Sequence, residues 1–280
     1  SATPRVNGYD LTRLFIGSEG TLGVITKIRL RLHGIPEAMS AAVCQFPTLA
    51  AAVETVITVM QTGVPVARIE LLDEDQMEAC IKYSKLEGFE AKTTLFLEFH
   101  GTDASVKEQA ESVEAIATDF GASGFAWATD AEARNKLWQA RHDAYWAAVA
   151  LKPAHRGITT DVCVPISRLA EAVVQAKETA KASGLTSCIV GHVGDGNFHC
   201  LILFPEGSQE GLEKAWALDR AIVAQGLALG GTCSGEHGVG LGKREFLEQE
   251  HGVEALAVMR GIKASLDPRG IMNPGKIFRN

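Results

Sequence analysis

Hydrophobic and polar positions along the chain predict short strands that alternate with amphipathic helices. Residues 24–32 alternate apolar side chains with lysine and arginine, which is the period-2 pattern of a half-buried strand. The segment His33-Gly34-Ile35-Pro36 then breaks the pattern and predicts a domain boundary. Beyond it we expect strands over 41–46, 66–72, 93–100 and 124–128, and helices over 48–61, ended by Gly63, and 103–120, capped by Asp103. Repeated β-α-β units of this kind favour an antiparallel sheet with helices on one face.

The second half of the chain continues this alternation and then becomes mostly helical. Asp130 is expected to cap one long helix through Ala150, and Ser167 to cap a helix that ends near Gly184. Strands are expected over 159–164, 187–193 and 198–204, followed by helical sequence from 208 with a glycine-rich break at 230–242. Asp267-Pro268 is expected to end the last helix. The predicted fold class is therefore α+β with a helical C-terminal part.

The sequence between the strands at 187–193 and 198–204 predicts a tight hairpin. Asp195-Gly196 suits the two central positions of a type I′ turn, where both residues need a positive φ. That turn pairs Val193 with Phe198 and places His192 opposite His199. Residues directly opposite in an antiparallel pair share a face, with Cβ atoms roughly 5 Å apart.

Two imidazoles held in this way can bind one divalent metal ion. Glu236, in the segment Gly235-Glu236-His237-Gly238, is a natural third ligand that leaves one coordination position open. Two imidazoles and a carboxylate suit zinc, manganese or iron(II), and the residues do not choose among them. The competing interpretation is a glycine-rich turn with incidental histidines at 192 and 199.

Three further residues are candidates for binding or catalysis, each with an alternative. His237 is expected to act as a general base, and its alternative role is that of another metal ligand. Arg141 offers a planar fork for a substrate carboxylate, or it is a solvent-exposed arginine on an amphipathic helix. Asn197 either hydrogen-bonds the substrate or serves the geometry of the turn.

The glycine-rich segments do not match the known nucleotide-binding motifs. Residues 235–244 lack the glycine and the Ser/Thr that a Walker A motif needs. Gly17-Ser18-Glu19-Gly20-Thr21-Leu22-Gly23 lacks the dinucleotide spacing and precedes a predicted strand instead of a helix. What remains is a loop whose backbone closely approaches a ligand, a flavin or its pyrophosphate being one option.

Composition limits the class of protein. The 280 residues are 46% hydrophobic and 22% charged, which is ordinary for a globular protein. A net charge of −7 argues against nucleic acid as a main partner, and no run of about 18 apolar residues predicts a membrane span. The six cysteines form no C-x-x-C pair and are expected to be buried free thiols. Because the chain starts Ser1-Ala2-Thr3-Pro4, we expect a missing N-terminal portion that would carry any targeting segment.

Four motifs in order resemble one family, the FAD-linked oxidases of the vanillyl-alcohol-oxidase type. They are GSEGTLG at 17–23, GHVGDGNFH at 191–199, SGEHGVG at 234–240 and LDPRGIMNPGK at 266–276. The similarity covers essentially the whole chain. It points to the branch that oxidises D-lactate, glycolate or D-2-hydroxyglutarate, and the stretches VARIELLD, FLEFHG and TDVCVPISRL are most similar to cytochrome-type D-lactate dehydrogenases.

The resemblance implies a domain organisation and a set of roles. Residues 1–35 would end a PCMH-type FAD-binding domain, 36–266 would form a substrate (cap) domain with a ferredoxin-like antiparallel sheet, and 267–280 would return to the flavin domain. His192, His199 and Glu236 match the family's metal ligands, and His237 matches its catalytic histidine. Arg141 matches an arginine that binds the substrate carboxylate, and Asn197 stays a candidate for substrate binding. The FAD contacts would come from Gly17, Ser18, Glu19, Gly20, Thr21, Gly23 and Asn273.

The implied activity is FAD-dependent, metal-assisted oxidation of a small D-2-hydroxy acid, D-lactate first, to the 2-oxo acid. Thr160 stands where the hydroxyglutarate branch has a lysine, which disfavours a second distal carboxylate on the substrate. The expected electron acceptor is a cytochrome, a quinone or an electron-transferring flavoprotein, and a second copy of the chain is a candidate partner. We expect an intracellular protein, cytoplasmic or peripheral to a membrane. The alternatives are oxidation of D-2-hydroxyglutarate or glycolate, a non-redox fragment that binds metal and hydroxy acid, and a metal-dependent hydrolase.

Overall fold

The computed structural model describes residues 8–278, apart from the side chains of residues 133, 136, 137 and 140. The first seven residues of the predicted flavin-domain segment lie outside this range. The described chain forms two compact units. Unit 1 joins residues up to Ile35 with Cys233 and all that follows it, and unit 2 is Pro36–Thr232. No helix within the described residues has the length and apolar character needed to cross a bilayer.

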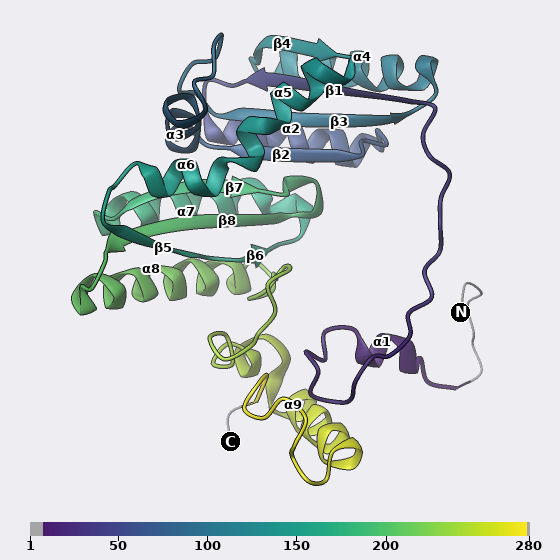
Figure 1. Ribbon diagram of the computed structural model, residues 1–280, viewed down its shortest axis with the longest axis vertical. Helices are drawn as coiled ribbons and strands as arrows, with labels where there is room; N and C mark the ends of the chain where they lie inside the picture. The colour runs from purple at the N-terminus through teal and green to yellow at the C-terminus, as the bar shows by residue number, and fades with distance from the viewer. Residues whose placement is uncertain (1–7, 279–280) are drawn as a thin grey trace. The chain divides into compact units, whose positions relative to one another are not determined.

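Unit 2 is built on one antiparallel sheet in the strand order β4-β1-β3-β2-β7-β8-β5, with β6 paired to β8 (Figure 1). The strands are β1 Ala38–Gln45, β2 Arg68–Leu72, β3 Thr94–Gly101, β4 Ser123–Ala128, β5 His155–Thr159, β6 Val162–Cys163, β7 Thr186–Gly191 and β8 Asn197–Pro205. The helices are α2 Leu49–Thr62, α3 Glu74–Ser84, α4 Asp103–Asp119, α5 Ala131–His142, α6 Ala144–Ala150, α7 Leu169–Ser183 and α8 Gln209–Ala228. The predicted α+β class with a ferredoxin-like sheet is confirmed.

The sheet contains one connection pattern used twice. The strands β1 to β4 follow the ferredoxin-like β-α-β-β-α-β path, with α2 and α4 as the crossing helices and α3 added between β2 and β3. In the second half β5, α7, β7, β8 and α8 repeat most of that path. The two halves join where β2 pairs with β7, with Leu71 opposite Gly191 and Leu72 opposite Val190. Glu70 on β2 and His192, which follows β7, lie at this junction.

Helices cover both faces of the sheet, and the expected one-sided cover is wrong. Successive residues of β1 and β3 are buried, which requires packing on each face. On one face α3, α5 and α6 enclose a core that contains Val43, Leu72, Phe96 and Trp138. The helices α4, α2, α7 and α8 contact one another in that order. Figure 1 shows α5 and α6 on the near side of the sheet and α7 on the far side.

Several local predictions need correction because of where polar groups find partners. The predicted helix 130–150 is broken at Asp143, whose carboxylate accepts hydrogen bonds from Ser84 and Gln139. Thr102, instead of Asp103, caps α4, and Ser167 lies in a short 3₁₀ turn before α7 without capping it. The predicted strand 159–164 is divided between β5 and β6.

Residues 24–32 form no strand in the described structure. Their predicted inward side chains are exposed, with Ile28 at 70% and Leu30 at 74%. No described strand lies beside this segment to pair with it, and a strand is stabilised by its cross-strand neighbours. The alternating pattern at 24–32 thus suits a strand, but the segment forms none in the described structure.

A buried ion cluster fixes α7 to the corner between β2 and α3. The ammonium of Lys177 lies 2.5 Å from a carboxylate oxygen of Asp73 and 2.6 Å from one of Asp75. Asp73 is fully buried, and burial raises its pKa to about 6 although Lys177 opposes the shift. Such a cluster holds its elements in place mainly because separating the charges leaves one of them buried and unpaired.

Unit 1 has little regular structure. It contains α1 Leu11–Phe15 and α9 Leu247–Leu266, and α9 is interrupted at Gly252, which has φ 80° and ψ 166°. The carboxylate of Asp267 ends α9 by accepting the amide hydrogens of Ile271 and Met272 and by pairing with Lys263. These bonds hold the pKa of Asp267 at about 2. The predicted end of the last helix at 267–268 is confirmed.

The six cysteines are all free, and five of them are buried, as expected. The compact unit 2 ends at Thr232, whereas the predicted substrate domain extends to 266. The structure therefore groups 233–266 with the N-terminal segment.

Candidate functional site

The histidine pair of the predicted hairpin is brought together, although by a different turn. In the β7–β8 pairing Val190 lies opposite His199, so the predicted register is wrong by two residues. The connection is a 3₁₀ turn over 193–195, closed by Gly196 at φ 79°. A Cβ at position 196 would lie 2.2 Å from the Val164 carbonyl oxygen, so only glycine fits there.

The two-residue shift preserves the face of the strand, and this is why the histidines still meet. Side chains two residues apart on a strand share a face, so His192 becomes the diagonal neighbour of His199. The ring centroids of His192 and His199 are 5.7 Å apart, with the rings nearly perpendicular at 86°. The His199 side chain is almost fully buried, and that of His192 is about one-third exposed at 35%.

Each histidine has a hydrogen-bond acceptor at Nδ1. For His199 it is the carbonyl oxygen of Thr160 at 3.0 Å, and for His192 it is Oε1 of Glu70 at 2.7 Å. A carbonyl oxygen accepts only, and an ionised carboxylate does the same, so in the matching neutral tautomer Nδ1 donates and the lone pair lies on Nε2. Metal-binding histidines in proteins almost always have an acceptor of this kind on the other ring nitrogen.

Glu70 joins His192 to Arg141. Its side chain is 5% exposed, and its second oxygen, Oε2, accepts a hydrogen bond from Nε of Arg141 at 3.0 Å. Glu70 lies on β2 next to Leu71, which pairs with Gly191, and this places it beside His192. Arg141 is thus oriented by a buried carboxylate that faces the metal-ligand candidate on its other side.

Thr160 and Asp161, in the segment between β5 and β6, lie beside His199 and Cys200 of β8. The Thr160 hydroxyl accepts the amide hydrogen of Cys200 at 2.8 Å, and its backbone N–H donates to the Cys200 carbonyl oxygen. Asp161 is fully buried, with a carboxylate oxygen 3.8 Å from Nδ1 of His199. The Thr160 side chain is buried against β8. The expectation that Thr160 disfavours a substrate with a second carboxylate stays a prediction.

Asn197 is two residues before His199 on β8 and shares its face. Its side chain is buried, and its amide oxygen has no hydrogen-bond partner within the described residues. Buried acceptors are nearly always satisfied, so this one favours the substrate-binding interpretation over the turn interpretation. Next to the histidine pair, His192, Glu70 and Asp195 line a cavity of about 330 Å³.

The other two chemical candidates belong to unit 1. Glu236 and His237 lie in the glycine-rich loop, each about half exposed, with 3.7 Å between Oε1 of Glu236 and Nε2 of His237. The described structure places them together in one loop. The three-ligand set of His192, His199 and Glu236 stays a prediction.

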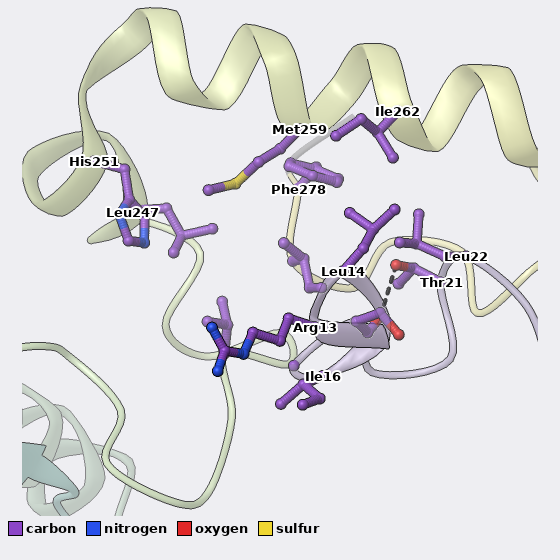
Figure 2. Close-up of a pocket in the computed structure, with 14 residues that line it drawn as sticks. Arg13, Leu14, Ile16, Thr21, Leu22, Leu247, His251, Met259, Ile262 and Phe278 are labelled. Carbon is purple, nitrogen blue, oxygen red and sulfur yellow. Dashed lines mark hydrogen bonds between the residues drawn. The ribbon is translucent and has the colours of Figure 1, made fainter. Parts of the chain in front are cut away.

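The predicted cofactor segment 17–23 forms a tight turn after α1. Four of its residues, Gly17, Ser18, Thr21 and Leu22, line an apolar cavity of about 330 Å³ together with side chains from α1, α9 and the C-terminal segment. Figure 2 shows Leu14, Leu22, Met259, Ile262 and Phe278 around this cavity and the hydrogen bond from the Thr21 hydroxyl to the Ser18 carbonyl oxygen. Gly20, Gly23, Glu19 and Asn273 do not line it.

Two of these predicted cofactor residues make internal contacts instead. The Glu19 carboxylate accepts hydrogen bonds from the amides of Val239 and Gly240. The side-chain amide of Asn273 donates to the Glu19 carbonyl oxygen at 2.5 Å.

Sequence reasoning missed Glu70 and the backbone role of Thr160. Glu70 occurs in an otherwise buried strand, where an acidic residue is rare without a partner. That signal was present in the sequence, but its partners at 141 and 192 are too distant along the chain for spacing to reveal them.

Comparison with known proteins gives a consistent family. Residues 35–277 match the family described as FAD linked oxidases, C-terminal domain. The chain is 51% identical to "Probable D-lactate dehydrogenase, mitochondrial" of Danio rerio, covering 97% of this chain and 54% of the relative. It is 48% identical to "D-lactate dehydrogenase [cytochrome], mitochondrial" of Arabidopsis thaliana, covering 97% and 48%.

Solved structures agree on the fold. The 4-ethylphenol oxidase of Gulosibacter chungangensis superposes with a TM-score of 0.68 at 17% identity, over 90% of this chain and 56% of that one. By the coverages of the two D-lactate dehydrogenase relatives, the chain spans about half the length of the curated relatives that it matches.

Proposed function

We propose, on the premise that this chain belongs to the FAD-linked oxidases and matches their C-terminal domain, that it supplies the substrate- and metal-binding half of a flavoenzyme. The reaction is the oxidation of a small D-2-hydroxy acid to the 2-oxo acid, with D-lactate as the first candidate substrate. The names of the relatives from Danio rerio and Arabidopsis thaliana support that choice. In this proposal residues 1–35 end the FAD-binding domain, 36–266 form the substrate domain, and 267–280 return to the flavin domain.

The observation that carries the proposal is the pair of Nδ1 hydrogen bonds made by His192 and His199. Both acceptors favour the tautomer that directs the Nε2 lone pair of each ring to a cation, so the donor set fits a divalent metal ion. Bound there, zinc, manganese or iron(II) would act as a Lewis acid toward the substrate hydroxyl. Glu236 is the proposed third ligand.

Chain connectivity supports the inclusion of Glu236 and His237. Thr232, the last residue of unit 2, pairs with Cys163, and Cys163 is paired with Asn197 at the start of β8. Glu236 follows Thr232 by four residues. Four residues extend at most about 14 Å, so the backbone limits how far Glu236 can lie from the histidine hairpin.

The chain's own residues divide the remaining work. Arg141 donates through its Nη atoms to the substrate carboxylate while Glu70 holds its Nε, and Asn197 offers its amide to the substrate. His237 takes the proton of the 2-hydroxyl group at a ring nitrogen. The net reaction removes that proton and the α-hydrogen with two electrons and leaves a 2-oxo acid.

The cofactor is FAD, which when bound accepts the α-hydrogen as hydride. Gly17, Ser18 and Thr21 are the residues that would hold part of it, because they line the cavity of unit 1, whose apolar side chains suit a planar ring system (Figure 2). Gly20 and Gly23 stay predicted backbone contacts. A contact of the Glu19 carboxylate with FAD would compete with the hydrogen bonds that it accepts from the amides of Val239 and Gly240.

The electron acceptor that we favour is a cytochrome, since the Arabidopsis thaliana relative carries that word in its name. A quinone, an electron-transferring flavoprotein and a second copy of the chain stay as predicted partners. Both relatives are named mitochondrial, which supports an intracellular location.

The test uses the natural full-length protein loaded with FAD. His237→Asn should lower D-lactate turnover by about 10²–10⁴-fold, the usual contribution of a general base, and leave bound metal unchanged. L-lactate should not be oxidised. Full turnover in His237→Asn would remove His237 as the base, and absence of D-lactate oxidation by a flavin-loaded wild type would favour glycolate, D-2-hydroxyglutarate or a non-redox binding role.

A further inference from the structure

The loop that carries Glu236 and His237 is held at one end by a side chain from the 17–23 segment. Oε1 of Glu19 accepts the amide hydrogen of Val239 at 2.6 Å, and Oε2 accepts that of Gly240 at 2.9 Å. Both carboxylate oxygens therefore bind consecutive backbone amides some 220 residues away in sequence. Hydrogen bonds from neutral donors to a carboxylate are among the stronger ones in proteins.

The neighbouring positions are shaped around this contact. Gly238 has φ 81°, a conformation that favours glycine, and a Cβ there would lie 2.8 Å from Oε1 of Glu19, so a larger residue would displace that carboxylate. Glu19 itself has φ 51°, an uncommon conformation for a residue with a side chain. The Asn273 side chain holds the Glu19 carbonyl oxygen, which stabilises that conformation.

The other end of the same loop is also held by a carboxylate. Oε2 of Glu250, on α9, accepts the amide hydrogen of Cys233 at 2.9 Å. Residues 234–238 thus lie between two fixed points. They include two glycines, at 235 and 238, and glycine backbone can adopt more conformations than that of other residues.

We infer that Glu19 is a positioning residue for Glu236 and His237, acting through the backbone of Val239 and Gly240. The inference rests on the proposed function of those two residues and gives the GSEGTLG motif a role besides cofactor contact. The reason is geometric: a displacement of about 1 Å at a reacting group can cost about 10²-fold in rate. Two anchored ends keep the loop within that tolerance before substrate arrives.

The experiment compares Glu19→Gln with Glu254→Gln in the natural full-length protein loaded with FAD. Glutamine keeps one acceptor oxygen but turns an NH₂ group toward an amide hydrogen, whereas Glu254 is an exposed glutamate of the same unit. We expect Glu19→Gln to lower kcat about 100-fold while KM changes less than threefold. The same substitution should lower the affinity for Co²⁺ about 10–100-fold. FAD content and the melting temperature should stay close to those of Glu254→Gln.

A second variant approaches the contact from the loop side. Gly238→Ala places a methyl group against Oε1 of Glu19 without removing the carboxylate. If both variants act through one contact, their effects on Co²⁺ affinity and kcat will be strongly non-additive in the double variant. Glu19→Asp, which keeps the charge but is one methylene shorter, should recover part of kcat.

Three outcomes would overturn the inference. They are additive effects of the two substitutions, an unchanged kcat in Glu19→Gln, and a loss of FAD that fully accounts for the loss of turnover. A wild type that oxidises D-lactate but binds no Co²⁺ would instead contradict the metal part of the proposed function, and the kcat comparison would still decide the role of Glu19.

Discussion

The two units position chemistry in different ways. In unit 2, His199, Asn197 and Glu70 stand on paired strands, and each side chain is placed by the register of the sheet and by burial. In unit 1, Glu236 and His237 stand on a glycine-rich loop whose ends are held by the carboxylates of Glu19 and Glu250. A sheet resists displacement through many backbone bonds at once, whereas these two carboxylates hold the loop through three backbone amides. A single substitution should therefore displace the candidate residues of unit 1 more easily than those of unit 2.

The largest effect on stability should come from the buried ion cluster of unit 2. Lys177→Met leaves the carboxylate of Asp73 buried without its partner, and we expect a loss of about 3–5 kcal/mol in the free energy of unfolding. The matched control is Lys181→Met, whose ammonium is exposed and whose ion pair with Glu74 should contribute less than about 1 kcal/mol.

Urea unfolding followed by tryptophan fluorescence measures this difference. All four tryptophans lie in unit 2, so the signal reports that unit. Because the folded pKa of Asp73 is raised to about 6, its own titration favours the folded state below pH 4 and disfavours it as pH rises through 6. Equal small losses in both variants would show that the cluster does not hold the sheet.

The next effect concerns the orientation of the predicted metal ligand. Glu70→Gln keeps the shape of the side chain but cannot accept from both His192 and Arg141, so we expect metal affinity to fall about 10–100-fold. The control is Glu98→Gln on β3, where a similarly buried carboxylate lies 2.8 Å from His100 and 3.9 Å from Arg68. Isothermal titration with Zn²⁺ in the full-length protein makes the comparison. Equal affinity losses in the two variants would mean a general effect on the sheet.

The smallest effect is expected at the end of α9 in unit 1. The pKa of Asp267 is lowered to about 2, chiefly by its bond with Lys263 and by the Met272 amide, so its charge stabilises the fold above pH 4. This contribution is lost as pH falls from 4 to 2. Hydrogen exchange at the Met272 amide should be faster in Asp267→Asn than in wild type at pH 5, and the two should converge near pH 2. A constant ratio across that range would exclude titration of Asp267 as the cause.

Much of the unit 2 fold could be predicted from local signals. Gly63 ends α2 in the left-handed conformation and Gly184 ends α7, as the sequence indicated. Thr48, predicted as the first residue of the helix, instead caps α2. The two-sided cover of the sheet was missed although β3 contains three consecutive apolar residues, Leu95, Phe96 and Leu97, a pattern typical of a strand buried on both faces.

The proximity of His192 and His199 was predicted correctly, although from the wrong turn. The Asp195-Gly196 turn was expected to set the register, but Gly196 instead closes a 3₁₀ turn because it must pass the Val164 carbonyl oxygen. The error of two residues left both histidines on one face. Glu70 and the Glu19 contact could not be predicted from spacing, because their partners are far away in sequence and the fold alone brings them together.

The most direct test of the account is a Co²⁺ titration of the natural full-length protein, read from the visible absorption of the bound ion. If two histidines of unit 2 and one glutamate of unit 1 share a metal ion, the wild type will bind one Co²⁺ per chain. His199→Ala and Glu236→Ala, one from each unit, will each lower the affinity by at least about 100-fold. Undiminished binding in either variant, or no binding by the wild type, would contradict the shared site.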